Sequence, residues 1–214
     1  REVLAKQHLK TVSNYFGDQK QALEFFINVV ATVQRNPKLL ECEPDTLLNS
    51  FLTMASLRLM PSAVSGEAYV LPYRNGGVMQ AQFQLGYKGL VTLLYRAGNR
   101  EVVAELVREH DKFALKRGKI DHEVDPRKTQ DDRGQVIGAY AIITTPLGGT
   151  VEQYMTIKDI MAHGKSFSKS FSSDHSPWKP ENDPQGWMPR KTVLIQACKL
   201  APKSGDVMMA IAED

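Results

Sequence analysis

Apolar residues recur every three or four positions near the start of the chain, which is the spacing of amphipathic helices. One such helix is predicted over residues 21–31, with Asp18 as its capping residue and Asn36-Pro37 as its stop signal. A second helix is predicted from Pro44 to a stop at Met60-Pro61. The N-terminal third of the chain is therefore expected to be helical.

After residue 66 the pattern changes to the two-residue alternation of β-strands. Residues 67–73 and 78–85 flank a glycine-containing turn, which predicts a β-hairpin. In the second strand of this hairpin, apolar residues alternate with Gln80, Gln82 and Gln84. One face of the strand is therefore expected to be apolar and the other to be a row of amides.

The rest of the chain predicts one more helix, several strands and then further helices. The helix is expected to begin at Gly86-Tyr87, and the strands lie at 101–109, 113–124, 135–145 and 150–157. Thr156 followed by Asp159 is typical of a helix N-terminus. This order of elements indicates an α+β fold, a mainly antiparallel sheet with packed helices, in a single domain over residues 1–214.

The C-terminal region combines a polar segment with a strong helical pattern. Residues 164–186 are rich in Ser, Pro, Lys and Gly and predict a mobile loop. The last strong helix is expected from Arg190 to Leu200, with Arg190, Lys191 and Lys199 on its polar surface, and a short helix follows from Asp206.

The net charge of +3 conceals an uneven distribution of charged residues. Residues 67–120 hold nine basic and five acidic side chains, and residues 158–203 hold eight and four, whereas 121–157 hold three and six. Such asymmetry fits a polyanionic partner, although loops of uneven charge produce the same pattern. No run of about 20 apolar residues is present, which excludes an integral membrane protein, and two distant cysteines fit a reducing cytosol.

The sequence contains few candidates for catalytic chemistry. Gly164-Lys165-Ser166 resembles the end of a phosphate-binding loop, but Asp159 stands where that loop needs glycine, so a Ser/Lys loop is the preferred interpretation. The histidines lack metal-ligand spacing and no nucleophile elbow occurs, so we expect no enzyme, metal or cofactor site. One alternative is a metal-dependent nuclease, because Asp121, Glu123 and Asp125 alternate along a predicted strand.

Basic and aromatic residues occur together near the ends of the predicted strands and helices. Single-stranded nucleic acid is bound by this combination, because cations follow the phosphates and aromatic rings stack on bases. A protein-binding adaptor without affinity for DNA is a further hypothesis. The candidate DNA-binding residues are Tyr73, Arg74, Tyr87, Lys88, Arg96, Arg108, Lys112, Lys116, Arg117, Arg190, Lys191 and Lys199. The predicted mobile loop adds Lys165, Phe167, Lys169, Phe171, Trp178 and Lys179.

Several short segments are distinctive in their residues as well as in their pattern. They are SLRLMPS at 56–62, GEAYVLPY at 66–73, QLGYKGL at 84–90, RAG at 96–98, VREHDKF at 107–113 and WMPRKT at 187–192. In this order they resemble the motifs of the RecT family of phage recombinases, and the resemblance covers most of the chain.

The resemblance implies a single-stranded DNA-binding and annealing protein that pairs complementary strands in phage homologous recombination without ATP. It also implies rings or helical filaments, a fold similar to the annealing-protein superfamily, and the cytoplasm of a bacterial host. The partners that it implies are single-stranded DNA, the annealed duplex, further copies of the chain and a phage exonuclease of the RecE type. A host single-strand binding protein is a further candidate partner.

From these expectations we form a hypothesis about mechanism. A groove holds the phosphates of one strand, while the bases face outward to be tested by a second strand. The residues expected to line this groove are Lys88, Arg96, Arg108, Lys112, Arg190, Lys191 and Lys199. The tip of the first hairpin, with Asn75, Val78 and Met79, inserts between groups of bases. The N-terminal helices, about residues 1–60, and the loop 164–186 make the contacts between copies.

Overall fold

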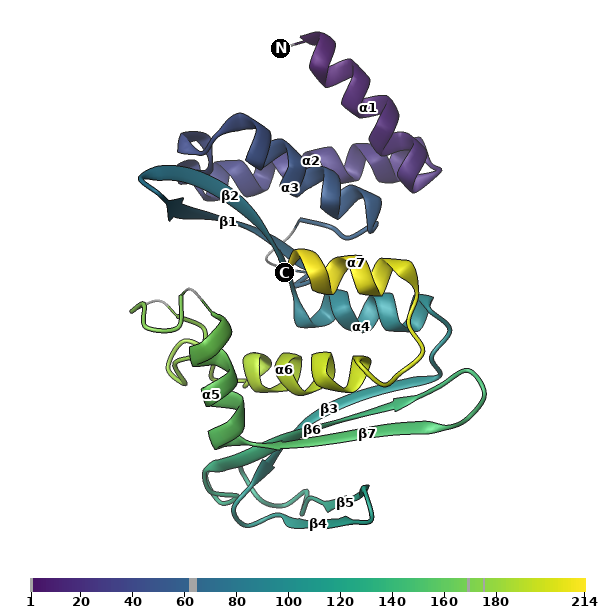
Figure 1. The fold of residues 1–214 in the computed structure, drawn as a ribbon, viewed down its shortest axis with the longest axis vertical. Helices are drawn as coiled ribbons and strands as arrows, with labels where there is room; N and C mark the ends of the chain where they lie inside the picture. The colour runs from purple at the N-terminus through teal and green to yellow at the C-terminus, as the bar shows by residue number, and fades with distance from the viewer. Residues whose placement is uncertain (1, 62–64, 169, 175) are drawn as a thin grey trace. The chain divides into compact units, whose positions relative to one another are not determined.

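The computed structural model describes residues 2–61, 65–168, 170–174 and 176–214 (Figure 1). Helices and antiparallel strands make up the described chain, which confirms the α+β class. The chain divides into two compact units, Arg1–Leu93 with Gly205–Asp214 and Leu94–Ser204, and each is described by itself. The single functional domain stays a prediction. Two residues of the sequence analysis, Ser62 and Lys169, lie outside the described residues.

The first unit begins with helices, as the apolar spacing predicts. They are α1 (Glu2–Phe16), α2 (Gln19–Arg35), the 3₁₀ helix η1 (Pro37–Glu41) and α3 (Pro44–Ser56). The Asp18 carboxylate accepts a hydrogen bond from the backbone N–H of Lys20 at 2.9 Å, and Asn36 forms the C-cap of α2. Both predicted ends of α2 are therefore confirmed.

A two-stranded antiparallel ribbon follows the helices of this unit. Strands β1 (Ala68–Asn75) and β2 (Val78–Leu85) are joined by Gly76 and Gly77, whose φ angles of 56° and 89° suit a tight hairpin turn. The apolar face of β2 packs on α3. There the backbone N–H of Ala81 donates to Thr46 Oγ1 at 3.0 Å. The predicted hairpin, with one apolar face, is confirmed.

Two helices complete the first unit around the end of this ribbon. Helix α4 (Tyr87–Arg96) begins directly after β2, and α7 (Gly205–Glu213) packs against β2. The backbone N–H of Leu85 donates to the Asp214 carboxylate at 2.7 Å, so the last residue of the chain is attached to the end of β2.

The second unit is built on a three-stranded antiparallel sheet with the order β3-β6-β7. Its strands are β3 (Glu101–Arg108), β6 (Val136–Thr144) and β7 (Thr150–Thr156). Helices α5 (Ile157–Phe167) and α6 (Trp187–Cys198) pack on one side of the sheet. The hairpin of β4 (Lys112–Lys116) and β5 (Lys119–Glu123) lies on the other side (Figure 1).

A buried ion pair holds the β4–β5 hairpin to the sheet. Asp111, 1% exposed, accepts hydrogen bonds from Arg133 Nε at 2.7 Å and Arg133 Nη2 at 2.8 Å. The same carboxylate accepts from the backbone N–H of Arg108 at 2.8 Å and lies 3.1 Å from His122 Nε2. His122 Nδ1 in turn lies 3.3 Å from the Tyr140 hydroxyl. Hydrogen bonds from the Arg133 guanidinium hold the pKa of Asp111 well below its ordinary value. Phe113 then packs on Tyr140, with ring centroids 6.3 Å apart.

The loop predicted to begin at residue 164 begins only after Phe167, and part of it is buried. Helix α5 continues to Phe167, so Gly164, Lys165 and Ser166 are helical and the prediction of a Ser/Lys loop there is wrong. The reason is a tertiary contact: a Cβ atom at Gly164 would lie 2.5 Å from Trp178, so the glycine allows the indole to pack on the helix. Trp178 is only 8% exposed and therefore belongs to the core instead of offering a surface for bases.

The Asp111 ion pair generates a prediction about stability. Replacing Asp111→Ala leaves Arg133 partly buried without its partner, so the free energy of unfolding at pH 7 should fall by about 3–5 kcal/mol. Because the pKa of Asp111 is lower in the folded chain than the unfolded value of about 3.9, the pair stabilises above about pH 4 and loses its effect as the pH falls further. The variant should lack this acid-dependent loss.

Urea unfolding followed by tryptophan fluorescence measures the free energy of unfolding directly, because Trp178 and Trp187 both lie in the second unit. The control is Asp125→Ala, which removes an exposed ion pair with Arg127 and should leave the unfolding midpoint nearly unchanged. Equal effects of the two substitutions would show that the buried pair does not hold the hairpin.

Candidate nucleic-acid interface

The start of α4 lies directly against the backbone that leads into β1. A Cβ atom at Gly86 would collide with the carbonyl oxygen of Gly66, and one at Gly89 would collide with that of Glu67. The backbone N–H of Gly86 donates to the Glu67 carbonyl at 2.8 Å. No larger side chain fits at either glycine without a shift of the backbone, which explains the spacing of glycines in this part of the sequence.

The carboxylate of Glu67 reinforces this contact from both sides. Its Oε2 accepts a hydrogen bond from the backbone N–H of Met60 at 3.0 Å, and its Oε1 accepts one from Thr92 Oγ1 at 3.3 Å. Glu67 thus links the segment after α3, the start of the ribbon and helix α4.

The same contact brings an aromatic and a basic side chain together at the surface. A Cβ placed on Gly66 would lie 3.3 Å from Lys88 Cδ and 3.4 Å from the Tyr69 hydroxyl, so both side chains lie over this glycine. Lys88 is exposed, and within the described part of the chain it forms no ion pair. Tyr69 is half-buried, and burial raises the pKa of its hydroxyl. A cation beside an aromatic ring is suited to phosphate and base contacts.

The tip of the ribbon carries the side chains predicted to insert between bases. Arg74, Asn75 and Val78 are exposed there, as that hypothesis requires. Met79 differs, because it is half-buried and its carbonyl accepts a hydrogen bond from the backbone N–H of Glu43 at 2.9 Å. Insertion itself stays a prediction, with Val78 as its exposed apolar residue.

In the second unit the tip of the β4–β5 hairpin is basic. Lys116 and Arg117 are exposed, with Arg117 at a φ of 52° in the turn. Lys119 Nζ instead donates to Thr150 Oγ1 at 2.5 Å and to Glu152 Oε1 at 2.7 Å, so it fastens the hairpin to β7. Lys116 and Arg117 are therefore the cations of this hairpin that are available to a ligand.

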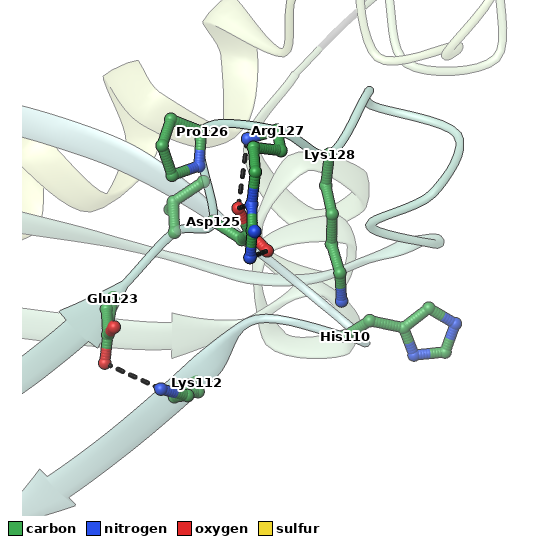
Figure 2. Close-up of a pocket in the computed structure, with 8 residues that line it drawn as sticks. His110, Lys112, Glu123, Asp125, Pro126, Arg127 and Lys128 are labelled. Carbon is green, nitrogen blue, oxygen red and sulfur yellow. Dashed lines mark hydrogen bonds and ion pairs between the residues drawn. The ribbon is translucent and has the colours of Figure 1, made fainter.

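A cavity of about 420 Å³ lies beside this hairpin and contains two of the carboxylates of the nuclease hypothesis (Figure 2). Glu123 pairs with Lys112 at 3.1 Å, and Asp125 pairs with Arg127 at 3.0 Å. Asp121 lies on β5, opposite Ala114 of β4. Among the residues that the structure describes, no three His, Cys, Asp or Glu side chains are grouped to hold a metal ion. The geometry therefore gives the nuclease hypothesis no support.

Other predicted contact residues are engaged within the second unit. Arg108 donates to the Gly134 carbonyl at 2.7 Å, and Arg190 pairs with Glu105 at 3.0 Å. Lys191 is 7% exposed, so its expected place on the surface of α6 is wrong. The sequence could not show this, because α6 carries polar residues on both faces and only its packing against the sheet selects the buried one.

The candidate residues are thus distributed over both units. Tyr73, Arg74, Tyr87 and Lys88 belong to the first, and Arg96, Arg108, Lys112, Lys116, Arg117, Arg190, Lys191 and Lys199 to the second. A groove that joins them stays a prediction. Sequence reasoning assigned no role to Glu67 or to the amide row of β2, although the alternation in that strand was a visible signal.

Comparison with known proteins adds an independent finding. Residues 24–214 match the RecT family. The chain is 28% identical over 197 residues to Protein RecT of Escherichia coli (strain K12), a match that covers 89% of this chain and 71% of that protein. It is 29% identical over 175 residues to the uncharacterized protein YqaK of Bacillus subtilis (strain 168), covering 82% of this chain and 57% of YqaK. The resemblance seen in the short motifs is therefore confirmed.

Within the described residues, no helix is both long enough and apolar enough to cross a membrane.

The close contact at Gly89 predicts the direction in which Gly89→Ala changes the stability of the first unit. Gly89→Ala would stabilise an unconstrained helix by about 0.8–1.0 kcal/mol. Here the added Cβ meets the Glu67 carbonyl, so we expect a loss of about 1–3 kcal/mol in the stability of the first unit. Native-state hydrogen exchange of the β1 and β2 amides measures it. The control is Gly205→Ala at the start of α7, where no atom lies within 4 Å of the added Cβ. A stabilised Gly89→Ala variant would contradict the tight contact.

Proposed function

The chain belongs to the RecT family, and we propose on that basis that it anneals complementary single strands of DNA in recombination and does so without ATP. The observation that carries this proposal at the level of residues is the pair of Lys88 and Tyr69 over Gly66, an exposed cation beside an aromatic ring. The same unit carries the exposed ribbon tip with Arg74. No nucleotide is needed as fuel, because stacking in the duplex contributes about 1.4 kcal/mol per step.

The proposed mechanism separates the holding of one strand from its pairing with another. Exposed cations, Lys88 and Arg74 in the first unit and Lys116 and Arg117 in the second, bind phosphates. Contacts to the backbone carry no sequence information, so any strand is accepted and its bases stay available for pairing. Val78 at the ribbon tip inserts between groups of bases.

An annealing experiment tests this function against its alternatives. Labelled complementary oligonucleotides are incubated with the protein and Mg²⁺ but without ATP, and the products are separated on a gel. Annealing gives a duplex faster than in the protein-free control, whereas a nuclease shortens the oligonucleotides and an adaptor has neither effect.

Self-association is part of the proposal, in the form of rings or filaments. Leu23, Ile27 and Val30 are 56–60% exposed and are spaced to lie on one face of α2. An apolar face of this kind is normally buried, and a second copy of the chain is the occupant that we propose. A phage exonuclease of the RecE type and a host single-strand binding protein are the proposed partners in the bacterial cytoplasm.

The role of Lys88 is tested by its effect on salt dependence. Lys88→Ala should weaken binding equally for oligonucleotides of different sequence and reduce the slope of log affinity against log salt by about 0.7, the value for one phosphate contact on a single strand. Fluorescence anisotropy titrations at several salt concentrations provide the slope. Lys38→Ala removes the same charge from η1, outside the proposed site, and should leave the slope as it is. An unchanged slope for Lys88→Ala would remove this lysine from the interface.

The role of α2 is tested by a single charge on its apolar face. Ile27→Asp should shift the DNA-free protein toward smaller species in sedimentation velocity, because a carboxylate is costly to bury between subunits. Gln21→Asp adds the same group to an exposed position of the same helix and should leave the distribution unaltered. If Ile27→Asp also assembles normally, the contacts between copies lie elsewhere.

A further inference from the structure

One face of the β1–β2 ribbon is less buried than the other. Tyr69 lies opposite Gln84, Leu71 opposite Gln82 and Tyr73 opposite Gln80, and residues paired in this way point to the same face. All six are half-exposed, whereas Val70, Ala81 and Phe83 on the opposite face are buried. The ribbon therefore presents a mixed surface of amides and aromatic rings.

The three glutamines of this face are not equivalent. Gln80 is used within the protein, because its Nε2 donates to the Glu43 carboxylate at 3.2 Å and its Oε1 accepts from Asn75 Nδ2 at 3.2 Å. The side-chain amides of Gln82 and Gln84 have no hydrogen-bond partner in the described part of the chain. Each of these amides offers two N–H donors and one carbonyl acceptor to a ligand.

The spacing of the two free amides suits a nucleic-acid backbone. Side chains two residues apart on a strand are separated by about 6.8 Å. Successive phosphates of one B-form strand advance by about 3.4 Å along the helix axis. A single strand that is unwound and extended to about twice this rise along β2 would therefore present about one phosphate to each amide.

A positive charge stands at one end of this row. Gln84 pairs with Tyr69, and the Tyr69 hydroxyl lies beside Lys88 over Gly66. An exposed cation thus lies beside one end of the row of amides, so a polyanion that binds Lys88 can extend along Gln84 and then Gln82. A neutral surface with a cation at its end is complementary to a single strand, whose bases and sugars need contacts other than charge.

We propose that Gln82 and Gln84, with Tyr69 and Leu71 opposite them, form an uncharged track that hydrogen-bonds the sugar–phosphate backbone of single-stranded DNA. The inference rests on the proposed annealing function and deepens it by assigning residues that contact the strand without charge. The amides donate to phosphate oxygens along the strand, and the track is independent of sequence because it does not read base edges.

This proposal has a thermodynamic signature that separates it from the role of Lys88. Neutral amides neutralise no phosphate and release no counterions, so their loss lowers affinity without altering its dependence on salt. The test variant is Gln82→Ala/Gln84→Ala, measured by anisotropy with a labelled thymidine oligonucleotide at several salt concentrations. We expect binding about tenfold weaker at every salt concentration, as for the loss of two modest hydrogen bonds, with the slope of the unmodified protein.

Two further variants keep the test decisive. Gln82→Thr/Gln84→Thr places β-branched residues that suit a strand but are too short to span the same distance, and it should bind as weakly as the alanine variant. Gln21→Ala on α2 should bind like the unmodified protein.

Unchanged affinity in both double variants would overturn the track, and so would a changed salt slope. Normal binding with altered oligomer size would also overturn it, since the face would then contact protein. If the unmodified protein binds no DNA at all, the proposed function fails first and the track fails with it.

Discussion

The arrangement of the first unit depends on one close approach between two stretches of backbone. Helix α4 starts so near to Gly66 and Glu67 that Gly86 and Gly89 cannot carry side chains. The Glu67 carboxylate then attaches Met60 and Thr92 to the same point. Because the ribbon and the helix are held together here, Tyr69 and Lys88 lie side by side at the surface.

Residues that hold the elements together and residues proposed to contact DNA are different side chains in the first unit, and the same is true in the second unit. Within the family-like segments, Gly86, Glu67 and the buried carboxylate of Asp111 hold the elements together. Exposed neighbours, Lys88 beside the first contact and Lys116 on the hairpin that Asp111 holds, carry the proposed phosphate contacts. Packing thus explains Gly86, Glu67 and Asp111 in the short segments that identify the RecT family, whereas the proposed DNA contacts are exposed side chains within these segments or beside them.

Local signals made much of this fold predictable. The caps at Asp18 and Thr156 and the turn at Gly76-Gly77 act within a few residues, so the sequence alone indicates them. Contacts between distant segments were not predictable. Trp178 packs on Gly164, and α6 buries Lys191, through neighbours far away in the sequence. The partners of Arg108 and Arg190 were also not predictable, because Gly134 and Glu105 lie far from them in the sequence.

Photochemical cross-linking tests most directly the claim that the ribbon and the start of α4 hold the strand. A single-stranded oligonucleotide that carries photoreactive groups on its phosphates is irradiated in the complex, and the cross-linked peptides are identified by mass spectrometry. The account predicts cross-links in residues 66–90, with Tyr69 or Tyr73 among the modified side chains. Efficient cross-linking confined to other parts of the chain, with residues 66–90 unmodified, would contradict it.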